Sequence, residues 1–250
     1  MIKSQRINQI KEYVFEHESV SLEELVKHFN VSKNTIRRDI QTLVEAGILK
    51  KVYGGVSVNH SALVVFNERR DQNLTKKQEI GKLASQFVED GEVIFVDSGT
   101  TTLELLPYIH HKQLTIISNN FDFIHQAKAY PSLAIFSTGG MLERKTNSFV
   151  GFQSIEFLKK YNINKAFLAS TGITLTNGVT NSSPLETEVK STIVEKSAKV
   201  YLMIDDSKFD KYGITTYCSL SDIDYLITNS MPVESYQQYA LEHGITIVTP

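Results

Sequence analysis

The chain has 250 residues, a length that fits one large domain or two small ones. With 41% hydrophobic and 22% charged residues it can bury a core, and its single cysteine, Cys218, excludes an internal disulfide and favours a reduced, cytoplasmic setting. The sequence predicts neither a bilayer-spanning run nor a signal peptide. A net charge of −2 argues mildly against a nucleic-acid-binding protein, which is usually basic.

The charges are unevenly distributed along the chain. Residues 1–58 contain nine Lys or Arg against seven Asp or Glu, a net charge of +2, whereas the remaining 192 residues carry a net charge of −4. The overall charge therefore combines a mildly basic first part with an acidic remainder, and local clustering matters more than the total.

The first 47 residues predict three short helices. Apolar residues recur at helical spacing in each of them, namely Ile7, Ile10, Val14 and Phe15, then Leu22, Leu25, Val26 and Phe29, then Ile36, Ile40, Leu43 and Val44. Ser21 and Glu24 form a capping-box pattern before the second helix, Ser32 is a good N-cap for the third, and Gly47 is a plausible stop. Residues 48–58 alternate around Gly54-Gly55, which predicts a hairpin.

The third helix has a polar face dense in basic and amide side chains. A helix-turn-helix protein places such a face in the DNA major groove, where Arg reads guanine and Asn or Gln reads adenine, while hydroxyls and a basic hairpin contact phosphates. The alternative is a solvated helix face that binds nothing, but the capped third helix and basic hairpin together favour DNA. The predicted DNA-binding residues are Ser32, Lys33, Asn34, Thr35, Arg37, Arg38, Gln41, Lys50, Lys51 and Tyr53.

The segment VSKNTIRRDIQTLVEAGILKKVYGG, residues 31–55, resembles the winged helix-turn-helix signature of the DeoR family of bacterial transcription regulators. One departure is Tyr53, where many members have His; its hydroxyl can still contact a phosphate. Asp39 matches an acidic position of the pattern. Because a carboxylate repels phosphate, we expect Asp39 to pair with a nearby Arg or Lys rather than to touch DNA.

Residues 59–75 lose periodicity and are expected to be a linker between a DNA-binding domain at 1–58 and a larger domain at 76–250. In the larger domain, short apolar strands alternate with helices, which predicts an α/β fold with a mainly parallel sheet. The expected strands lie in residues 92–97, 114–119, 133–138, 164–170, 199–204, 224–228 and 245–250, and helical patterns fall between them, for example in 75–90, 120–130, 184–197 and 232–244.

Polar clusters follow several of these strands. Asp97-Ser98-Gly99-Thr100-Thr101-Thr102 offers a tight turn, three threonine hydroxyls and helix N-terminal N–H groups, which suit a phosphate; the alternative is a threonine-rich helix cap without a ligand. Further clusters are Ser118–Asn120, Thr138–Gly140, Ser170–Gly172 and Asp205–Phe209. Ligands of open α/β sheets bind at the carboxyl ends of the strands, so these clusters predict a small-molecule site.

The resemblance to the DeoR family continues here, since DSGTTT, the Asn pair, ASTGI and DDSKF look like its effector-sensing domain, which is related in fold to the sugar-phosphate isomerases. It implies a phosphorylated sugar or polyol effector, with Ser98–Thr102 for the phosphate, Asn119 for a sugar hydroxyl and Lys208 for an anionic oxygen. The predicted effector-binding residues are Asp97, Ser98, Gly99, Thr100, Thr101, Thr102, Asn119, Gly140, Gly172, Glu186 and Lys208. For Glu186 and Glu188 the alternative is a solvated first helical turn.

An isomerase is the main alternative function, because Asp97, Asp205 and Glu186 could act as a base. None of these carboxylates forms the DGAD-type pair of the ribose 5-phosphate isomerases, so we expect a sensor and not an enzyme. Neither a cofactor nor a metal is expected, since His110-His111 point apart and lack a third ligand. The expected partners are double-stranded operator DNA, the effector and further copies of the chain in a homodimer or homotetramer.

Overall fold

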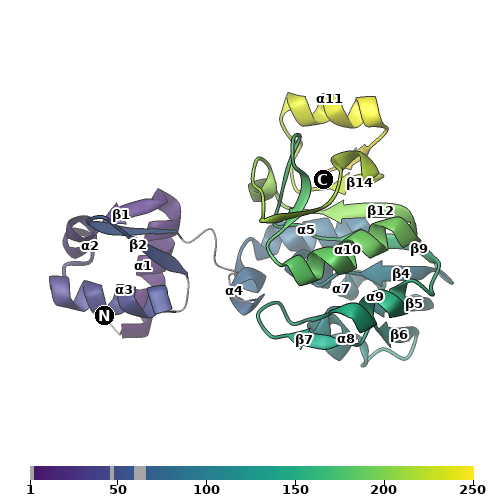
Figure 1. The fold of residues 1–250 in the computed structure, drawn as a ribbon, viewed down its shortest axis with the longest axis horizontal. Coiled ribbons are helices and arrows are strands. Elements are labelled where there is room, and N and C mark those ends of the chain that lie inside the picture. The colour runs from purple at the N-terminus through teal and green to yellow at the C-terminus, as the bar shows by residue number, and fades with distance from the viewer. Residues whose placement is uncertain (1–2, 46–47, 59–65) are drawn as a thin grey trace. The chain divides into compact units, whose positions relative to one another are not determined.

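The computed structural model describes residues 3–45, 48–58 and 66–250, which divide into two compact units, 1–64 and 65–250 (Figure 1). Each unit is described by itself below. Gly47, expected to end the third helix, and residues 59–65 of the expected linker lie outside the described residues.

The N-terminal unit contains the three predicted helices and a small antiparallel sheet. Its elements are α1 (Lys3–His17), β1 (Ser19–Ser21), α2 (Leu22–Phe29), α3 (Lys33–Glu45), β2 (Leu49–Val52) and β3 (Gly55–Val58). The predicted hairpin is β2–β3, and β1, which was not predicted, adds a third strand beside β3 in the order β1-β3-β2. This arrangement is a winged helix-turn-helix.

The apolar stripes of the three helices meet in one core. Ile10, Leu25 and Ile36, one from each helix, are completely buried. Two N-caps fix where α2 and α3 begin. Ser21 accepts a hydrogen bond from the Glu24 N–H at 3.1 Å, and Ser32 accepts one from the Thr35 N–H at 3.2 Å. The sequence therefore positions α3 so that its apolar stripe is buried and its opposite face is exposed.

The C-terminal unit is built on a seven-stranded sheet, all of whose strands are parallel. The strand order is β15-β14-β12-β9-β4-β5-β6. Their bounds are β4 (Val93–Val96), β5 (Leu114–Ser118), β6 (Leu133–Ser137), β9 (Ile163–Leu168), β12 (Ser197–Met203), β14 (Tyr225–Ile227) and β15 (Thr246–Val248). The seven strands and the mainly parallel sheet expected from the sequence are confirmed.

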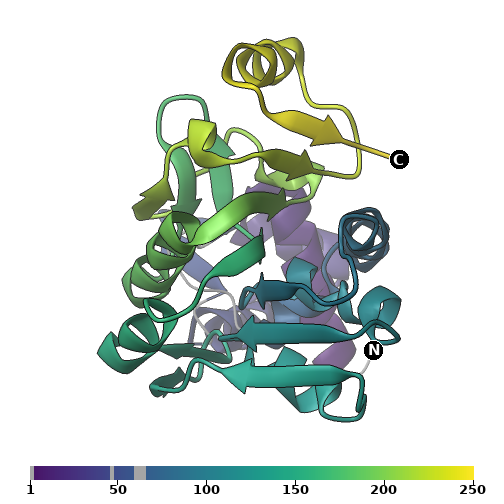
Figure 2. The ribbon, with the colours of Figure 1, turned by 90° about the vertical axis from the view of Figure 1, so that its right-hand side faces the viewer.

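Helices cover both faces of this sheet, as the two sides of Figure 2 show. One hydrophobic cluster packs α9 (Phe152–Leu158), α10 (Pro184–Lys196) and α11 (Glu234–His243) on one face. The other packs α5 (Leu74–Ser85), α6 (Thr100–Leu103), α7 (Leu106–Ile109) and α8 (Phe121–Ala127) on the opposite face. No described helix is both long and apolar enough to cross a membrane.

Smaller elements lie in the segments that follow the carboxyl ends of the strands. They are the hairpin β7 (Met141–Glu143) and β8 (Ser148–Val150), the antiparallel sheet of β10 (Gly172–Thr174), β11 (Gly178–Asn181) and β13 (Thr215–Cys218), and the 3₁₀ turns η1 (Asp206–Lys208) and η2 (Leu220–Asp222). The sequence did not predict these elements, because each has only three or four residues, too few for a recognisable periodicity.

Part of the expected linker is helical. Residues 66–71 form α4 (Phe66–Asp71), which packs against α6, and α5 begins at Leu74. The polar composition of this stretch suggested a linker, but Lys77, Ile80 and Ala84 turn one face of α5 inward and keep the segment within the C-terminal unit.

Candidate functional site

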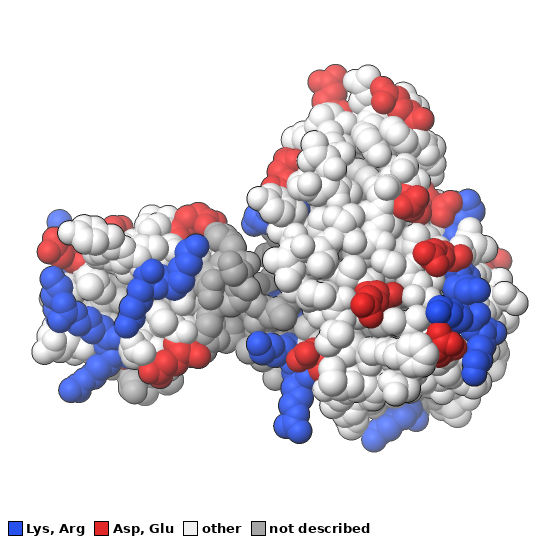
Figure 3. All heavy atoms as spheres, in the orientation of Figure 1, with Lys and Arg blue, Asp and Glu red and all other residues white. Residues whose placement is uncertain are grey.

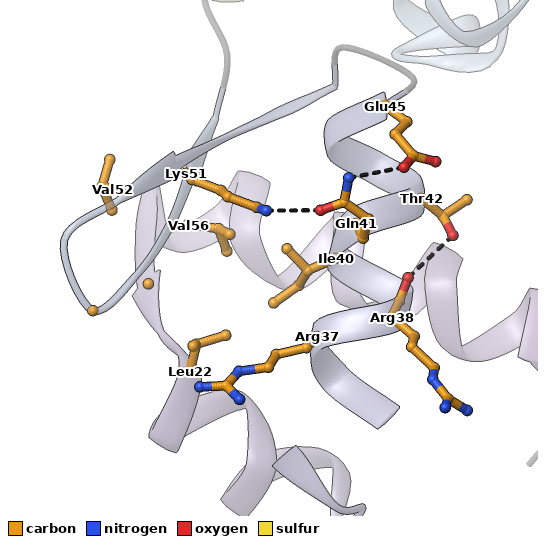
Figure 4. Close-up of a pocket in the computed structure, with 12 residues that line it drawn as sticks. Leu22, Arg37, Arg38, Ile40, Gln41, Thr42, Glu45, Lys51, Val52 and Val56 are labelled. Atoms are coloured by element: carbon orange, nitrogen blue, oxygen red, sulfur yellow. Dashed lines mark hydrogen bonds between the residues drawn. The ribbon is translucent and has the colours of Figure 1, made fainter. Parts of the chain in front are cut away.

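A groove of about 580 Å³ lies between α3 and the β2–β3 hairpin of the N-terminal unit (Figure 4). Leu22, Ile40 and Val56 supply its apolar part. Its polar lining comes from α3 and β2, namely Arg37, Arg38, Gln41, Thr42, Glu45 and Lys51. The groove therefore combines an apolar part with a polar lining in which, among the described residues, basic side chains outnumber the single acidic one, Glu45.

The polar face of α3 is directed away from the core. Ile36, Asp39, Ile40 and Leu43 are buried, whereas the ten predicted DNA-binding residues are all exposed or half-buried. Tyr53 is fully exposed at the end of the hairpin. In Figure 4, Arg37 extends toward Leu22 and the groove, while Arg38 extends in another direction. Lys and Arg side chains gather over the N-terminal unit in the view of Figure 3.

Asp39 does not contribute a negative charge to this exposed face. Its carboxylate is buried and accepts hydrogen bonds from Nε and Nη2 of Arg6, at 2.6 and 3.4 Å. The hydrogen bond that Arg6 donates to Asp39 raises the pKa of Arg6, with a smaller opposing effect of burial. The predicted pairing is confirmed, and it ties α3 to α1.

Gln41 connects α3 to the hairpin in a way that the sequence did not reveal. Its Oε1 accepts a hydrogen bond from Nζ of Lys51 at 2.7 Å, and its Nε2 donates to Oε1 of Glu45 at 2.8 Å (Figure 4). An adenine contact by Gln41, as predicted from the sequence, would require both hydrogen bonds to be exchanged. Gln41 therefore links the hairpin to α3.

In the C-terminal unit, Asp97 is the centre of a buried ion pair at the end of β4. Its carboxylate pairs with Nζ of Lys190 on α10, and neither residue is more than 2% exposed. Asp97 also accepts from the Ala169 N–H at 3.0 Å, and Lys190 donates to the Ala169 carbonyl at 2.9 Å. The pair thus joins the ends of β4 and β9 to α10.

Glu186 belongs to the same buried network. Oγ of Ser98 donates to its Oε1 at 2.8 Å, and Nδ2 of Asn181 donates to its Oε2 at 3.1 Å. The alternative of a solvated first turn is wrong for Glu186, which is 5% exposed, but it describes the exposed Glu188.

The threonines after β4 have different surroundings. Oγ1 of Thr102 donates to the carbonyls of Asp97 and Gly99, at 2.7 and 2.8 Å, and so holds the turn. Thr100 and Thr101 line a pocket instead. The helix that they open, α6, has only four residues, so its dipole is a smaller source of anion attraction than the sequence suggested.

This pocket has a volume of about 60 Å³ and lies at the carboxyl ends of β4, β9 and β12. It is lined by Arg69, Gln72, Asn73, Lys77, Gly99, Thr100, Thr101, Ala169, Ser170, Asp205, Ser207 and Lys208. Three of these described residues are cationic and one, Asp205, is anionic. The lining is therefore suited to an anion with several oxygen atoms.

Burial perturbs the three cations. Burial, together with the nearby charge of Lys208, lowers the pKa of Lys77 to about 8, although Asp205 and Glu104 oppose the shift. Burial also lowers the pKa of Lys208, and the charge of Arg69 adds to that effect. For Arg69, burial lowers the pKa and the charges of Glu186 and Asp97 partly oppose it. A bound anion would favour the charged form of all three side chains.

Arg69 and Lys77 were missed by the sequence analysis. Lys77 carried a detectable signal, because it shares a helical face with Ile80, Gly81 and Ala84 and is 4% exposed. A lysine at a core position of an amphipathic helix needs a partner in the interior. Arg69 carried no such signal, since it lies in a stretch without periodicity.

Four of the predicted effector-binding residues line the pocket, namely Gly99, Thr100, Thr101 and Lys208. The other seven lie outside the lining: Asp97, Ser98, Thr102 and Glu186 belong to the buried network described above, and Asn119, Gly140 and Gly172 are packed elsewhere. Asn119 is buried at the end of β5, with its Nδ2 3.4 Å from the Phe149 carbonyl. A Cβ on Gly140, at φ +97°, would lie 2.6 Å from the Val150 carbonyl oxygen, and a Cβ on Gly172 would lie 2.3 Å from that of Lys211. Among the described residues, no group of three or more His, Cys, Asp or Glu is placed to hold a metal ion.

The chain is similar to known proteins over its whole length. A family model described as the DeoR C terminal sensor domain matches residues 72–230, and one described as the DeoR-like helix-turn-helix domain matches residues 6–62. The HTH-type transcriptional regulator IolR of Bacillus subtilis (strain 168) is 45% identical over 248 residues, which cover 98% of this chain and 99% of that protein. The glycerol-3-phosphate regulon repressor of Escherichia coli (strain K12) is 28% identical over 249 residues, 99% of both chains.

Among solved structures, a ribose 5-phosphate isomerase A from Methanocaldococcus jannaschii aligns with 55% of each chain at 16% identity, with a TM-score of 0.42. The curated relatives are transcription regulators and not enzymes. Both family models and the relative at 45% identity agree with the winged helix-turn-helix and parallel α/β architecture. The chain therefore belongs to the DeoR family of transcription regulators.

Proposed function

We propose that this protein represses a sugar or polyol catabolic operon by binding its operator DNA, and that a phosphorylated intermediate bound in the C-terminal pocket relieves repression. The observation that carries the proposal is the cation-lined pocket at the strand ends, in the same chain as a winged helix-turn-helix with an exposed basic helix face. The pocket would bind the effector, and the exposed face of α3 would bind the operator.

The DNA-binding part of the proposal assigns roles by side-chain chemistry. Arg37 and Arg38 read base edges in the major groove, and Asn34 reads adenine. Ser32, Thr35 and the hairpin residues contact the phosphate backbone and set the register. Each such unit reads one half-site, so specificity requires at least a homodimer, and a homotetramer also satisfies this requirement.

The effector part assigns an anionic phosphate to the pocket. Thr100, Thr101 and Lys208 bind its oxygens, while Asp97, Ser98, Thr102 and Glu186 hold the pocket in shape through the network described above. Recognition of a sugar hydroxyl by Asn119 and effector contacts by Gly140 and Gly172 stay predictions, since these residues lie outside the pocket lining.

The identity of the effector is proposed from resemblance. The segments RKTNSFVG, KYNINKAF and TLTNGVTNS resemble the repressor of myo-inositol catabolism in Gram-positive bacteria. We infer that a phosphorylated keto-acid of inositol breakdown is the inducer. Glycerol 3-phosphate, suggested by the name of one relative, is the second candidate.

A thermal-shift screen of the full chain with phosphorylated sugars and inositol intermediates tests the effector assignment. A compound that raises the Tm is then added to a mobility-shift assay with the DNA upstream of the chain's own operon. Binding of this DNA that is released by the compound supports the proposal. Binding of the operator that no phosphorylated compound alters would contradict the effector part, and absence of DNA binding would contradict the whole.

Replacing Thr101 by valine should weaken effector binding about 10- to 100-fold, because a hydrogen bond to a charged group contributes about 1.5–3 kcal/mol. Valine keeps the shape of threonine, so operator affinity without effector should not change. The measurement is the effector concentration that releases half of the DNA. Thr246→Val, on an exposed position of β15, is the matched control and should behave as wild type. Unchanged induction of Thr101→Val would remove this residue from the site.

A further inference from the structure

One side of the anion pocket is formed by the segment that enters the C-terminal unit from the N-terminal one. Arg69 belongs to α4, the first described helix after residues 59–65, and Gln72, Asn73 and Lys77 follow it. The other side is formed by the strand ends, among them Thr100, Ser170 and Lys208. The pocket therefore lies between the entering segment and the sheet.

Polar contacts hold this segment to the rest of the unit. Nζ of Lys77 donates to the backbone carbonyl of Arg69, which ties the end of α4 to α5. Nδ2 of Asn73 lies 3.4 Å from Oδ1 of Asp205, and Nζ of Lys76 donates to Oδ1 of Asp206 at 2.7 Å. The contacts of Asn73 and Lys76 are thus both directed at the turn η1 and its N-cap Asp205, and α4 also contacts α6.

The charges that line the pocket are mainly positive. Arg69 and Lys77 on the entering segment line it together with Lys208 on η1. Besides burial, the charges of Lys208 and Arg69 lower the pKa of Lys77 and the charge of Arg69 lowers that of Lys208, while Asp205 opposes both shifts. Like charges in a poorly solvated site repel more strongly than they do in water. A dianionic phosphate between them would turn this repulsion into attraction on both sides of the pocket.

We propose that the bound phosphate group bridges Arg69 and Lys77 to Lys208 and the Thr100–Thr101 turn, so that occupancy of the pocket fixes α4. The inference rests on the proposed function in one respect, since it takes this pocket as the effector site. Arg69 is then a positioning residue that conveys occupancy to the chain leading to the DNA-binding unit. A ligand shifts the equilibrium between attached and detached α4 only by the difference in its affinity for these two arrangements. The bridge supplies that difference, because it forms only when α4 is attached.

Hydrogen exchange of the full chain, with inorganic phosphate as the probe and chloride at matched ionic strength as the reference, tests the bridge. At about ten times its Kd, phosphate should slow exchange of residues 66–77 by about tenfold, because linkage favours the closed state by that factor. Residues 98–102 and 205–209 should be protected in parallel. Arg69→Met should keep protection of the strand-end segments and lose that of α4.

The possible results separate the bridge from the proposed function. Protection of residues 98–102 and 205–209 without protection of α4 in the wild type would overturn the bridge and leave the phosphate site standing. Full protection of α4 in Arg69→Met would also overturn it. No protection by phosphate anywhere would contradict the effector site itself. Lys82→Met, an exposed lysine of α5 outside the pocket lining, is the matched control and should retain protection both of α4 and of residues 98–102.

The pH dependence provides a second readout. Lys77, with a pKa of about 8, is charged below that pH, and the charged groups facing it are Lys208, Asp205, Arg69 and Glu104. Inorganic phosphate stays mainly a dianion from pH 8 to 9.5, so its affinity should fall by up to about tenfold per pH unit above pH 8 as Lys77 loses its proton. Lys77→Met should remove the part of this dependence that begins near pH 8. A phosphate affinity of the wild type that is constant from pH 7 to 9.5 would exclude Lys77 from the bridge.

Discussion

Replacing Lys190 by methionine is expected to destabilise the C-terminal unit by about 3–5 kcal/mol, the usual cost of removing one partner of a buried ion pair. Asp97 is completely buried, and without Lys190 its carboxylate would keep the Ala169 N–H at 3.0 Å and a share of the Ser98 hydroxyl, which is 3.3 Å away and also donates to Glu186 at 2.8 Å. Two neutral donors stabilise a carboxylate less than water does, so the unpaired charge disfavours the folded state. Urea unfolding monitored by the reactivity of the buried Cys218, the chain's only cysteine, measures this unit selectively.

Two further variants test whether the unpaired charge of Asp97 causes the loss of stability. Asp97→Asn combined with Lys190→Met removes both charges and should recover most of the lost stability. Lys196→Met changes an exposed lysine of the same helix and should alter the free energy of unfolding by less than about 0.5 kcal/mol. If Lys190→Met is as stable as the wild type, the Asp97 carboxylate is not a buried charge in the folded protein.

The DSGTTT motif illustrates how far the sequence could be interpreted. Its position after a strand and its threonines predicted a tight turn with a phosphate site, and Gly99, Thr100 and Thr101 do line a pocket. The sequence could not show which residues of the motif line the pocket and which stabilise the turn, because this depends on the side of the turn to which each side chain points. Asp97 and Thr102 point into the structure and stabilise the turn instead.

Strand order explains why other predicted residues lie outside the pocket. Asn119 and Gly140 follow β5 and the edge strand β6, and the strand ends of a parallel sheet do share one edge. The pocket, however, lies beside β4, β9 and β12, which are neighbours in the order β12-β9-β4-β5-β6. Periodicity predicts strands but does not determine which of them are adjacent. The faces of α3 depend on local periodicity alone and were predicted more closely: Ile36, Ile40 and Leu43 are buried as expected, and Val44 is half-buried.

Arg37→Ala and Arg38→Ala are each expected to weaken operator binding by about 1–3 kcal/mol, the cost of a lost bidentate base contact. Both side chains are exposed on α3, and Figure 4 shows them extending in different directions, so each should relax specificity at a different base pair. Their effects should therefore be nearly additive. The measurement is a mobility shift against a set of operators with single base-pair changes.

Two other residues of the same groove should respond differently from the arginines. Lys51→Ala removes a phosphate contact, so affinity should fall equally for all operators and the salt slope should decrease by about 1. Gln41→Ala should cost less than either arginine change, because a base contact by Gln41 must first replace its hydrogen bonds to Lys51 and Glu45. Arg144→Ala, an exposed arginine of the C-terminal unit, is the control. Wild-type operator affinity in both Arg37→Ala and Arg38→Ala would show that this face of α3 does not enter the major groove.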